Sequence, residues 1–330
     1  MTKIETFNIA ARLAQWADQK PESVALIEMR SGRQRTFKEL EQESSRLASG
    51  LIQFGMKSGE RVLLMVPYGI DFVTLTFAMF KAGLIPVLID PGLGKKNVLK
   101  CIKQVQPHGM IAIPLAHAIK RIFPDTFKSI QHNVTVGTRW FWGGASLNKL
   151  LDSGKTDFKM ASMEKEHPAA ILFTSGSTGP AKGVLFSHGI FNHQVRILQE
   201  QFDIQPDETD LPTFPLFGLF SSGLGMTSII PDMDSTKPAH VDPKNIIVPI
   251  QNFKISSSFG SPALWDTVSQ YCLDQNIQLP TLKRIIMAGG PVSGDLLARF
   301  ETIIDKGCKI YTPYGATEVL PVSLIDRREI

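Results

Sequence analysis

Hydroxyl, glycine and lysine side chains gather in one short stretch that could bind phosphate. It directly follows the apolar residues 169–173. Glycines let backbone N–H groups turn toward an anion, hydroxyls add hydrogen-bond donors, and the lysine adds positive charge. An ordinary surface turn is the alternative, because Ser, Thr and Gly also cluster in loops. The candidate phosphate ligands are Thr174, Ser175, Gly176, Ser177, Thr178, Gly179 and Lys182.

Two better-known phosphate motifs do not fit the sequence. A P-loop needs its lysine directly after a glycine, but Pro180 and Ala181 separate the two here. A dinucleotide fingerprint needs a third glycine after Gly223 and Gly225, and Ser228 stands at that position. These departures argue against a P-loop kinase and against a dehydrogenase.

Two further positions could contact a nucleotide. Gly289 and Gly290 follow a strand candidate at 282–288, and paired glycines are needed wherever a flat ring approaches the backbone. A plain tight turn is the alternative. Glu318 offers hard carboxylate oxygen, the ligand type that Mg²⁺ prefers. An exposed glutamate beside a turn is the alternative there.

Together these stretches resemble the adenylate-forming (AMP-binding) superfamily, which includes acyl-CoA synthetases, the adenylation domains of peptide synthetases, and luciferases. Residues 174–183 are similar to its signature Thr-Ser-Gly-(Ser/Thr)-Thr-Gly-x-Pro-Lys-Gly, with one departure at Pro180-Ala181. Residues 287–291 resemble the segment that lies against adenine, and residues 311–318 resemble the Tyr-Gly-x-Thr-Glu motif.

The resemblance implies a role for each matching residue. The catalytic residues would be Thr174, Lys182, Thr317 and Glu318. Of these, Thr317 would bond the α-phosphate and Glu318 would hold Mg²⁺, while Tyr314 would stack on adenine. His188 and His193, which follow the loop, are interpreted as structural. The residues expected to contact ATP or AMP are Thr174, Ser175, Gly176, Ser177, Thr178, Gly179, Lys182, Gly289, Gly290, Pro291, Tyr314, Gly315 and Thr317.

A stretch without charge extends from Leu211 to Pro231. It is long enough to cross a bilayer, but its internal prolines and glycines and the flanking Asp210 and Asp232 favour buried loops and short elements around a cavity. Part of it resembles the family's acyl-side motif, and an apolar cavity suits an aliphatic chain. Ordinary core packing is the alternative for each aromatic side chain. The residues expected to contact the acyl group are Phe217, Gly218, Phe220, Gly260 and Ser261.

Strand and helix candidates alternate along the chain. Strands separated by helices of this length predict right-handed crossovers and parallel sheets covered on both faces. We therefore expect an α/β fold with two packed subdomains, 1–165 and 166–330, the second carrying the ATP motifs. The strand candidates lie at 62–66, 85–89, 109–113, 169–173, 282–288 and 309–311, and the helix candidates at 36–55, 71–82 and 95–104.

Composition supports a globular protein with no need of a disulfide or a metal to hold its core. Of the 330 residues, 43% are apolar and 20% charged. The net charge of +4 is small and spread along the chain, so we expect no nucleic-acid partner. Three cysteines without a C-x-x-C pair predict neither a zinc site nor a disulfide framework. The polar start predicts no secretory signal, and a cytoplasmic location follows as the default.

The resemblance implies that a carboxylic acid, expected to be a long-chain fatty acid, reacts with ATP and Mg²⁺ to give an acyl-adenylate and pyrophosphate. Transfer to coenzyme A would follow. Residues 88–97 and 113–117 resemble the long-chain branch that includes the β-lactone synthetases of olefin biosynthesis. β-Lactone formation, peptide-synthetase-type adenylation, a non-catalytic nucleotide-binding module and a purely structural fragment stay open, as does a peripheral membrane contact.

The family's usual C-terminal elements have no candidate in this sequence. Family members continue past the Tyr-Gly-x-Thr-Glu motif with a ribose-binding aspartate, a hinge and a mobile domain that carries a catalytic lysine. This sequence ends at Ile330, shortly after Glu318. We therefore expect an N-terminal fragment, without the lid domain, that has little activity of its own.

Overall fold

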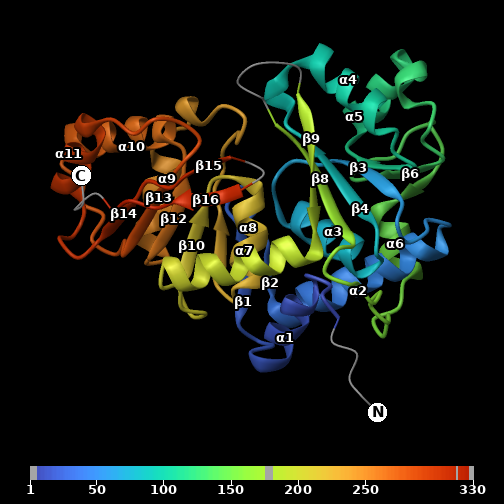
Figure 1. Cartoon of the computed structure of the whole chain (residues 1–330), viewed down its shortest axis with the longest axis horizontal. Helices are drawn as coiled ribbons and strands as arrows, with labels where there is room; N and C mark the ends of the chain where they lie inside the picture. The colour runs from blue at the N-terminus through green and yellow to red at the C-terminus, as the bar shows by residue number, and fades with distance from the viewer. Residues whose placement is uncertain (1–5, 175–180, 317–318, 327–330) are drawn as a thin grey trace. The chain divides into compact units, whose positions relative to one another are not determined.

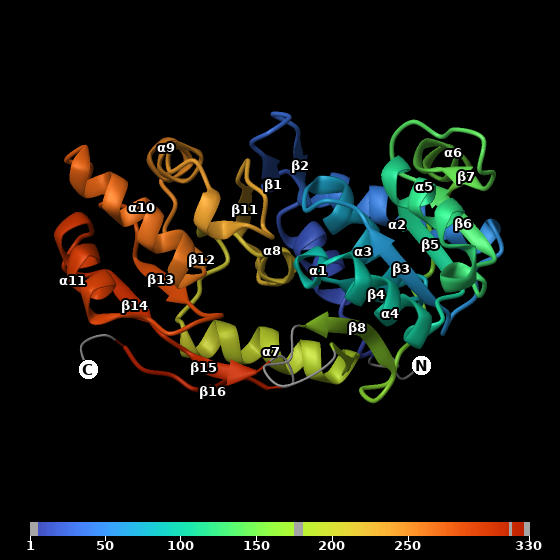
Figure 2. The ribbon, with the colours of Figure 1, turned by 90° about the horizontal axis from the view of Figure 1, so that it is seen from above.

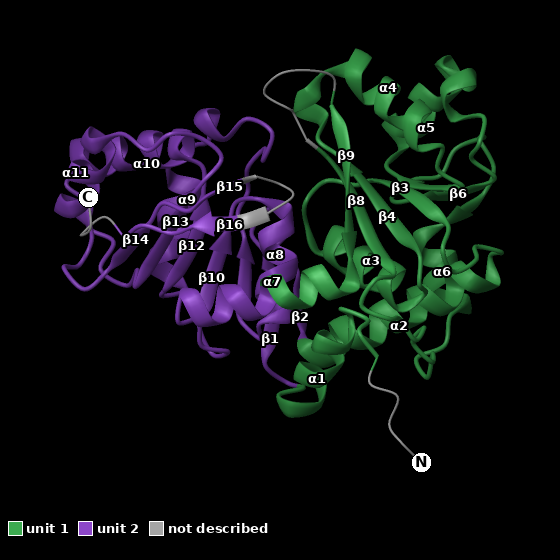
Figure 3. Cartoon of the chain, viewed as in Figure 1, with its two compact units in different colours: residues 1–21, 37–194 green, residues 22–36, 195–330 purple. Residues whose placement is uncertain are grey.

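The computed structural model describes residues 6–174, 181–316 and 319–326 (Figure 1). The chain forms two compact units (Figure 3). Unit 1 comprises residues 1–21 and 37–194, and unit 2 comprises residues 22–36 and 195–330. Each unit has its own seven-stranded sheet, parallel except for one antiparallel pair at an edge.

The sheet of unit 1 has the strand order β7-β6-β5-β3-β4-β8-β9. Its antiparallel pair is β8 with β9, which form a hairpin at one edge. The strands are β3 (Arg61–Met65), β4 (Ile85–Ile89), β5 (Gly109–Ala112), β6 (His132–Thr135), β7 (Ala145–Ser146), β8 (Pro168–Thr174) and β9 (Lys182–Ser187).

Helices cover both faces of this sheet. One face of the strands, including Leu63, Val87 and Met110, packs against α4 and α5 in a single apolar cluster. The crossover through α3 runs in the opposite direction, so the right-handed rule places α3 on the other face. There α2 packs against α3 and α6. The helices are α1 (Ala11–Gln19), α2 (Phe37–Gln53), α3 (Ile70–Lys81), η1 (Pro91–Leu93), α4 (Lys95–Val105), α5 (Pro114–Ile122), η2 (Pro124–Phe127) and α6 (Leu147–Ser153).

The sheet of unit 2 has the strand order β14-β13-β12-β10-β11-β1-β2. Two of its strands, β1 and β2, come from the start of the chain, and β1 pairs with β11 in parallel. The strands are β1 (Val24–Glu28), β2 (Gln34–Thr36), β10 (Thr209–Pro212), β11 (Thr227–Ile230), β12 (Ser257–Gly260), β13 (Arg284–Met287) and β14 (Lys309–Tyr311). A separate ribbon pairs β15 (Tyr314–Ala316) with β16 (Val319–Ser323).

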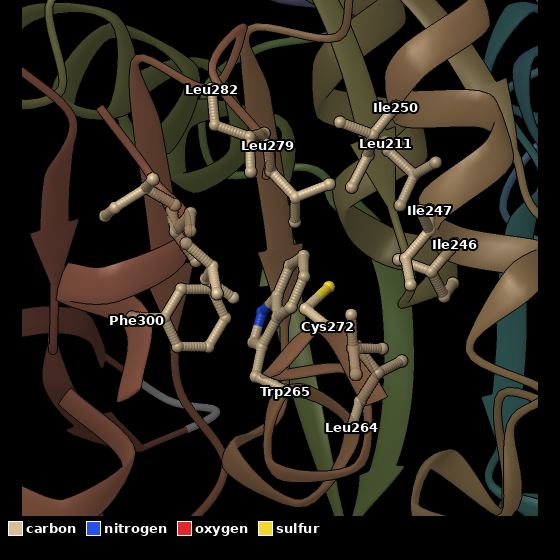
Figure 4. Packing of buried hydrophobic residues seen from close by; sticks show 14 of the residues in the cluster. Leu211, Ile246, Ile247, Ile250, Leu264, Trp265, Cys272, Leu279, Leu282 and Phe300 are labelled. Carbon is tan, nitrogen blue, oxygen red and sulfur yellow. The ribbon is translucent and has the colours of Figure 1, made fainter. Parts of the chain in front are cut away.

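The main core of unit 2 lies between its sheet and three helices on one face. Figure 4 shows Leu211 of the sheet with Ile246 and Ile250 of one helix and with Trp265 and Phe300 of the other two. In Figure 2 the helices that carry Trp265 and Phe300, α10 and α11, lie side by side. The helices are α7 (His188–Gln201), which begins in unit 1, then α8 (Pro215–Gly223), η3 (Pro238–His240), α9 (Lys244–Asn252), α10 (Pro262–Asp274) and α11 (Gly294–Ile303).

The boundary expected at residue 165 differs from the structure. The strand at residues 168–174, assigned to the second subdomain, is β8 and pairs with β4 inside the sheet of unit 1. The pairing is long-range, so local sequence does not reveal it. The stretch that could bind phosphate, residues 174–182 (the phosphate-loop candidate), therefore belongs to unit 1, whereas Gly289 and Tyr314 belong to unit 2.

The stretch without charge, residues 211–231, forms the end of β10, then α8 and β11, as expected of short elements. None of the described helices combines the length and the apolar content that a membrane span requires.

Candidate functional site

In unit 2 the carboxyl ends of the parallel strands share one edge of the sheet. The parallel registers align Pro212 with Phe259 and Gly260 with Met287. From β10 the chain crosses through α8 to one side, and from β12 it crosses through α10 to the other. Right-handed crossovers in opposite directions put these two helices on opposite faces. Open α/β sheets bind ligands at such a switch point, outside the carboxyl ends of the strands.

The turn after β13 has an open backbone. Gly289 has φ +92°, and a Cβ built there would meet no atom within 4 Å. A residue with a side chain is strained at this φ, so the backbone conformation itself calls for glycine. Gly290 and Pro291 are also exposed. The turn therefore leaves space in which a flat ring could lie against the peptide planes.

Tyr314 lies just after β14, the strand next to β13, and begins β15. β13 pairs with β14, with Ile286 opposite Tyr311, so the segments after both strands leave the sheet at the same edge. Tyr311 is buried, with its ring 4.9 Å from that of Phe202. Tyr314 is 72% exposed, so its ring is available for stacking.

Gly315, which follows Tyr314, is exposed as well. The two residues expected to contact the phosphates and the metal, Thr317 and Glu318, lie outside the described residues.

The expected acyl-contacting residues gather around the switch point. Phe217, Gly218 and Phe220 are buried on α8. The Phe217 ring stacks on that of Phe259 in β12, with centroids 3.5 Å apart and an interplanar angle of 10°. The Phe220 ring meets Phe217 edge-on at 5.9 Å. These aromatic side chains connect α8 to the carboxyl end of β12.

Gly260 and Ser261 have local structural roles at the same place. A Cβ on Gly260 would lie 2.5 Å from Nε1 of Trp265, so the indole occupies the space in front of the glycine. The Ser261 hydroxyl accepts a hydrogen bond from the Leu264 N–H at 3.2 Å and caps α10. Such a cap satisfies an N–H that the helix leaves without a partner. The acyl contact expected of both residues stays a prediction.

A buried carboxyl group lies beneath α8 that sequence reasoning did not connect with the site. Asp210 of β10 accepts a hydrogen bond from Ser221 of α8 at 2.5 Å. Burial raises the pKa of Asp210 to about 6, against the opposing effects of hydrogen bonds from Ser221 and Ser257 and of the charge on Arg284. In the sequence Asp210 only marks the end of a stretch without charge. Its partner Ser221 is one of several serines, and no local signal links the two.

In unit 1 the phosphate-loop candidate connects the two strands of the edge hairpin. β8 and β9 pair with Thr174 opposite Lys182. Lys182 is exposed at the start of β9. Ser175, Gly176, Ser177, Thr178 and Gly179 lie outside the described residues.

His188 lies after β9 and is completely buried. Its Nδ1 accepts a hydrogen bond from the Ile9 N–H at 3.2 Å, and its ring lies edge-on to Phe80, with centroids 6.0 Å apart. Burial, helped by the nearby His167, lowers the pKa of His188 to about 4. The imidazole is therefore neutral near pH 7, in keeping with the structural interpretation of this residue.

Lys81 is also buried and connects α3 to α2. Its Nζ lies 2.6 Å from Oε1 of Glu41 and donates to Oγ of Ser45 at 2.9 Å. Burial lowers the pKa of Lys81 to about 8, against the attraction of Glu41. Within the described ranges, no group of three or more His, Cys, Asp or Glu could hold a metal ion.

Comparison with known proteins places this geometry in a wider context. A family model described as AMP-binding enzyme matches residues 13–329. An olefin beta-lactone synthetase from Stenotrophomonas maltophilia (strain K279a) is 39% identical over 98% of this chain and 60% of its own length. A long-chain-fatty-acid–CoA ligase from Thermus thermophilus is 22% identical over 87% of this chain and 52% of its own length.

A solved structure shares the fold. The crystal structure of a long-chain-fatty-acid-CoA ligase from Archaeoglobus fulgidus has a TM-score of 0.84 and 20% identity to this chain, covering 95% of it and 65% of the ligase. The α/β architecture with helix-covered, mostly parallel sheets is therefore confirmed. The chain spans about 60% of the length of the beta-lactone synthetase that it matches.

Proposed function

We propose, from the premise that this chain belongs to the AMP-binding enzyme family, that it carries the sites at which ATP activates a carboxylic acid. The proposal is carried by two surfaces at the edge of the unit 2 sheet where the carboxyl ends of its parallel strands lie. There an exposed glycine turn with positive φ, at Gly289, and an exposed aromatic ring, at Tyr314, follow neighbouring strands. An adenine ring would contact the backbone at the first of these surfaces and stack on the second.

The proposed reaction is the attack of a carboxylate oxygen on the α-phosphorus of ATP. A new O–P bond forms, and the bond to pyrophosphate breaks with its electron pair on the leaving group. Lys182 and Thr174 would hold the phosphates, and Thr317 would bond the α-phosphate. Glu318 would hold Mg²⁺, which when bound would offset negative charge on the phosphates. Positioning and charge stabilisation would account for most of the rate.

We propose a long-chain fatty acid as the acid substrate. The aromatic side chains Phe217 and Phe220 lie at the switch point, on a helix in a stretch without charge. Burial of an aliphatic chain contributes about 0.8 kcal/mol for each CH₂, so an apolar site favours longer acids. The name of the Thermus thermophilus relative supports the same substrate class.

Two acceptors are proposed for the acyl group. Coenzyme A is the acceptor in relatives named as CoA ligases. The higher identity to an olefin beta-lactone synthetase, 39%, favours an acceptor inside the substrate. In that case the oxygen of a 3-hydroxyl group attacks the acyl carbon and loses its proton. The bond from the acyl carbon to AMP breaks, AMP leaves, and a four-membered lactone closes.

ATP–pyrophosphate exchange tests the first step. It would be measured on this chain and on any longer gene product that contains it, with fatty acids and 3-hydroxy fatty acids of increasing length. Exchange that depends on the carboxylate supports adenylation. ATP binding without exchange in every form would indicate a non-catalytic nucleotide module, and no binding at all a structural one. Mass spectrometry with and without coenzyme A then separates acyl-CoA from lactone.

A further inference from the structure

Large apolar side chains are exposed in unit 1, on α5 and on the loop that follows β6. Leu115 and Ile122 are 66% and 67% exposed. They are seven residues apart on α5 and therefore lie on the same face of that helix. In the loop, Trp140 is 56% and Phe141 77% exposed. Single exposed apolar residues are common, but large ones gathered on neighbouring segments mark interaction sites.

The loop aromatics are held in place by a partly buried anchor. The Trp142 ring stacks on His117 of α5, with centroids 5.3 Å apart and an interplanar angle of 12°. Its Nε1 donates a hydrogen bond to Oγ1 of Thr135 at 2.9 Å. The Trp140 ring in turn lies 5.3 Å from that of Trp142. Two large side chains are thus presented to solvent from a fixed base, so little conformational entropy would be lost on binding.

Positive charge accompanies these side chains. The Arg121 guanidinium lies 5.5 Å from the centre of the Phe141 ring, and Lys95 of α4 lies 4.8 Å from that of Phe123. Arg139 precedes Trp140 and is exposed. Residues 91–144 contain eight Lys or Arg and a single carboxylate, Asp125, in a chain whose net charge is only +4. The charge is therefore concentrated in this region and not spread along the chain as expected.

We infer that the surface made of Arg121, Arg139, Trp140 and Phe141 binds the interface of an anionic lipid bilayer. Trp beside basic residues is the composition that sits at the headgroup level, with apolar rings toward the acyl chains and cations at the phosphates. The basic side chains match a negatively charged leaflet. The site is peripheral and needs no membrane-spanning helix. It does not rest on the proposed function.

Vesicle flotation of the whole chain tests the inference. The chain should float with vesicles of phosphatidylcholine and phosphatidylglycerol, and much less with phosphatidylcholine alone or in high salt. Trp140→Ser with Phe141→Ser should lower the partition coefficient at least about tenfold. Arg121→Gln or Arg139→Gln should each lower it about fivefold, the equivalent of about 1 kcal/mol for each basic residue near the surface. Val248→Ser, at an exposed aliphatic position on α9, is the matched control and should change nothing.

Tryptophan quenching gives a second readout that does not depend on a drastic substitution. Brominated acyl chains should quench the exposed Trp140, while Trp265 is completely buried and should be unaffected. Trp140→Phe, which keeps an aromatic ring, should remove most of the quenching with flotation largely retained. Equal flotation of the double serine variant and the parent overturns the inference. So does binding to an acidic protein without any binding to anionic vesicles, which would identify the surface as a protein-docking site.

Discussion

Gly289 determines the shape of the turn after β13. Its φ of +92° lies in the region that only glycine adopts readily, and nothing within 4 Å would touch a Cβ there. A side chain at this position would therefore cost backbone strain while meeting no protein atom. A substitution at Gly289 would therefore change the conformation of the turn without disturbing the packing of the protein around it.

Gly289→Ala tests whether this turn receives adenine. We expect a loss of stability of about 1 kcal/mol, from strain at positive φ, and a larger loss of ATP affinity, because the new methyl group occupies the space in front of the peptide. Calorimetric titration with ATP and thermal unfolding measure the two effects. Gly294→Ala is the matched control, since that glycine also has no atom within 4 Å but no positive φ. Unchanged affinity in Gly289→Ala would place the adenine elsewhere.

Glu318→Gln tests the proposed metal ligand. The amide keeps the size of the side chain but removes the charge that would attract Mg²⁺. Loss of one well-placed electrostatic group costs about 10²–10³ in rate, so we expect a loss of that order in carboxylate-dependent pyrophosphate exchange. The measurement uses the most active form of the protein, and raised Mg²⁺ should recover part of the loss. Parental exchange in the variant would reject the metal role.

At the scale of elements, the hydrogen bond between Asp210 and Ser221 connects β10 to α8. The helix carries Phe217 and Phe220, so a group in the sheet holds the element that presents the proposed acyl site. A buried carboxyl group is an unusual anchor, because its charged form is costly to bury. The pKa of about 6 for Asp210 expresses that cost.

The stability of the fold should depend on pH through Asp210. Between the usual pKa of 3.8 and the folded value of about 6, the folded state keeps a proton that the unfolded state releases. The free energy of unfolding therefore falls as pH rises through this window. Above it the cost of burying the charge is complete and is on the order of 3 kcal/mol.

Asp210→Asn should remove this slope and raise the free energy of unfolding near neutral pH, since an amide oxygen still accepts from Ser221 without carrying charge. Urea unfolding on either side of the window measures the effect. Asp157→Asn, at an exposed position of unit 1, is the control and should keep the parental slope. A slope that persists in Asp210→Asn would assign the titration to another group.

At the scale of the whole molecule, each unit buries its own apolar core beneath its own sheet. A chain of this size buries roughly three quarters of the surface that its unfolded form exposes, which is sufficient for folding without a further domain. Strands β1 and β2 belong to unit 2 although they precede most of unit 1 in the sequence. The two units are therefore connected through more than one chain segment.

The 330-residue chain should bind ATP yet form acyl-adenylate slowly. We expect single-turnover adenylation to be at least about a hundredfold slower than in a fusion that adds the remaining part of the Stenotrophomonas maltophilia relative. In the family that this chain resembles, a catalytic lysine and a lid that excludes water follow the Tyr-Gly-x-Thr-Glu motif, and the fusion is designed to supply that region. Rapid-quench measurement on both proteins checks the ratio, with ATP affinity as the control. Equal rates would mean that a group within this chain replaces the lysine.

Local patterns in the sequence are sufficient to predict several of the strands and to indicate the chemistry of the motifs. Apolar runs bounded by turn residues predicted β3, β4, β5 and β14 within about a residue of their observed ends, because the hydrophobic pattern of a strand is local. The position of the glycine pair at 289–290, directly after a strand candidate, is readable for the same reason. Family membership, confirmed over residues 13–329, was readable because each motif is a short continuous stretch.

Which distant segments meet depends on packing that local sequence does not show. The pairing of β8 with β4 moved the unit boundary to residue 194, and the pairing of β1 with β11 placed residues 22–36 in unit 2. The bond from Asp210 to Ser221 and the exposed surface around Trp140 likewise depend on packing between segments. Strand order, burial and exposure arise from long-range contacts, whose free energy is set by the partner surface and not by neighbours in the sequence.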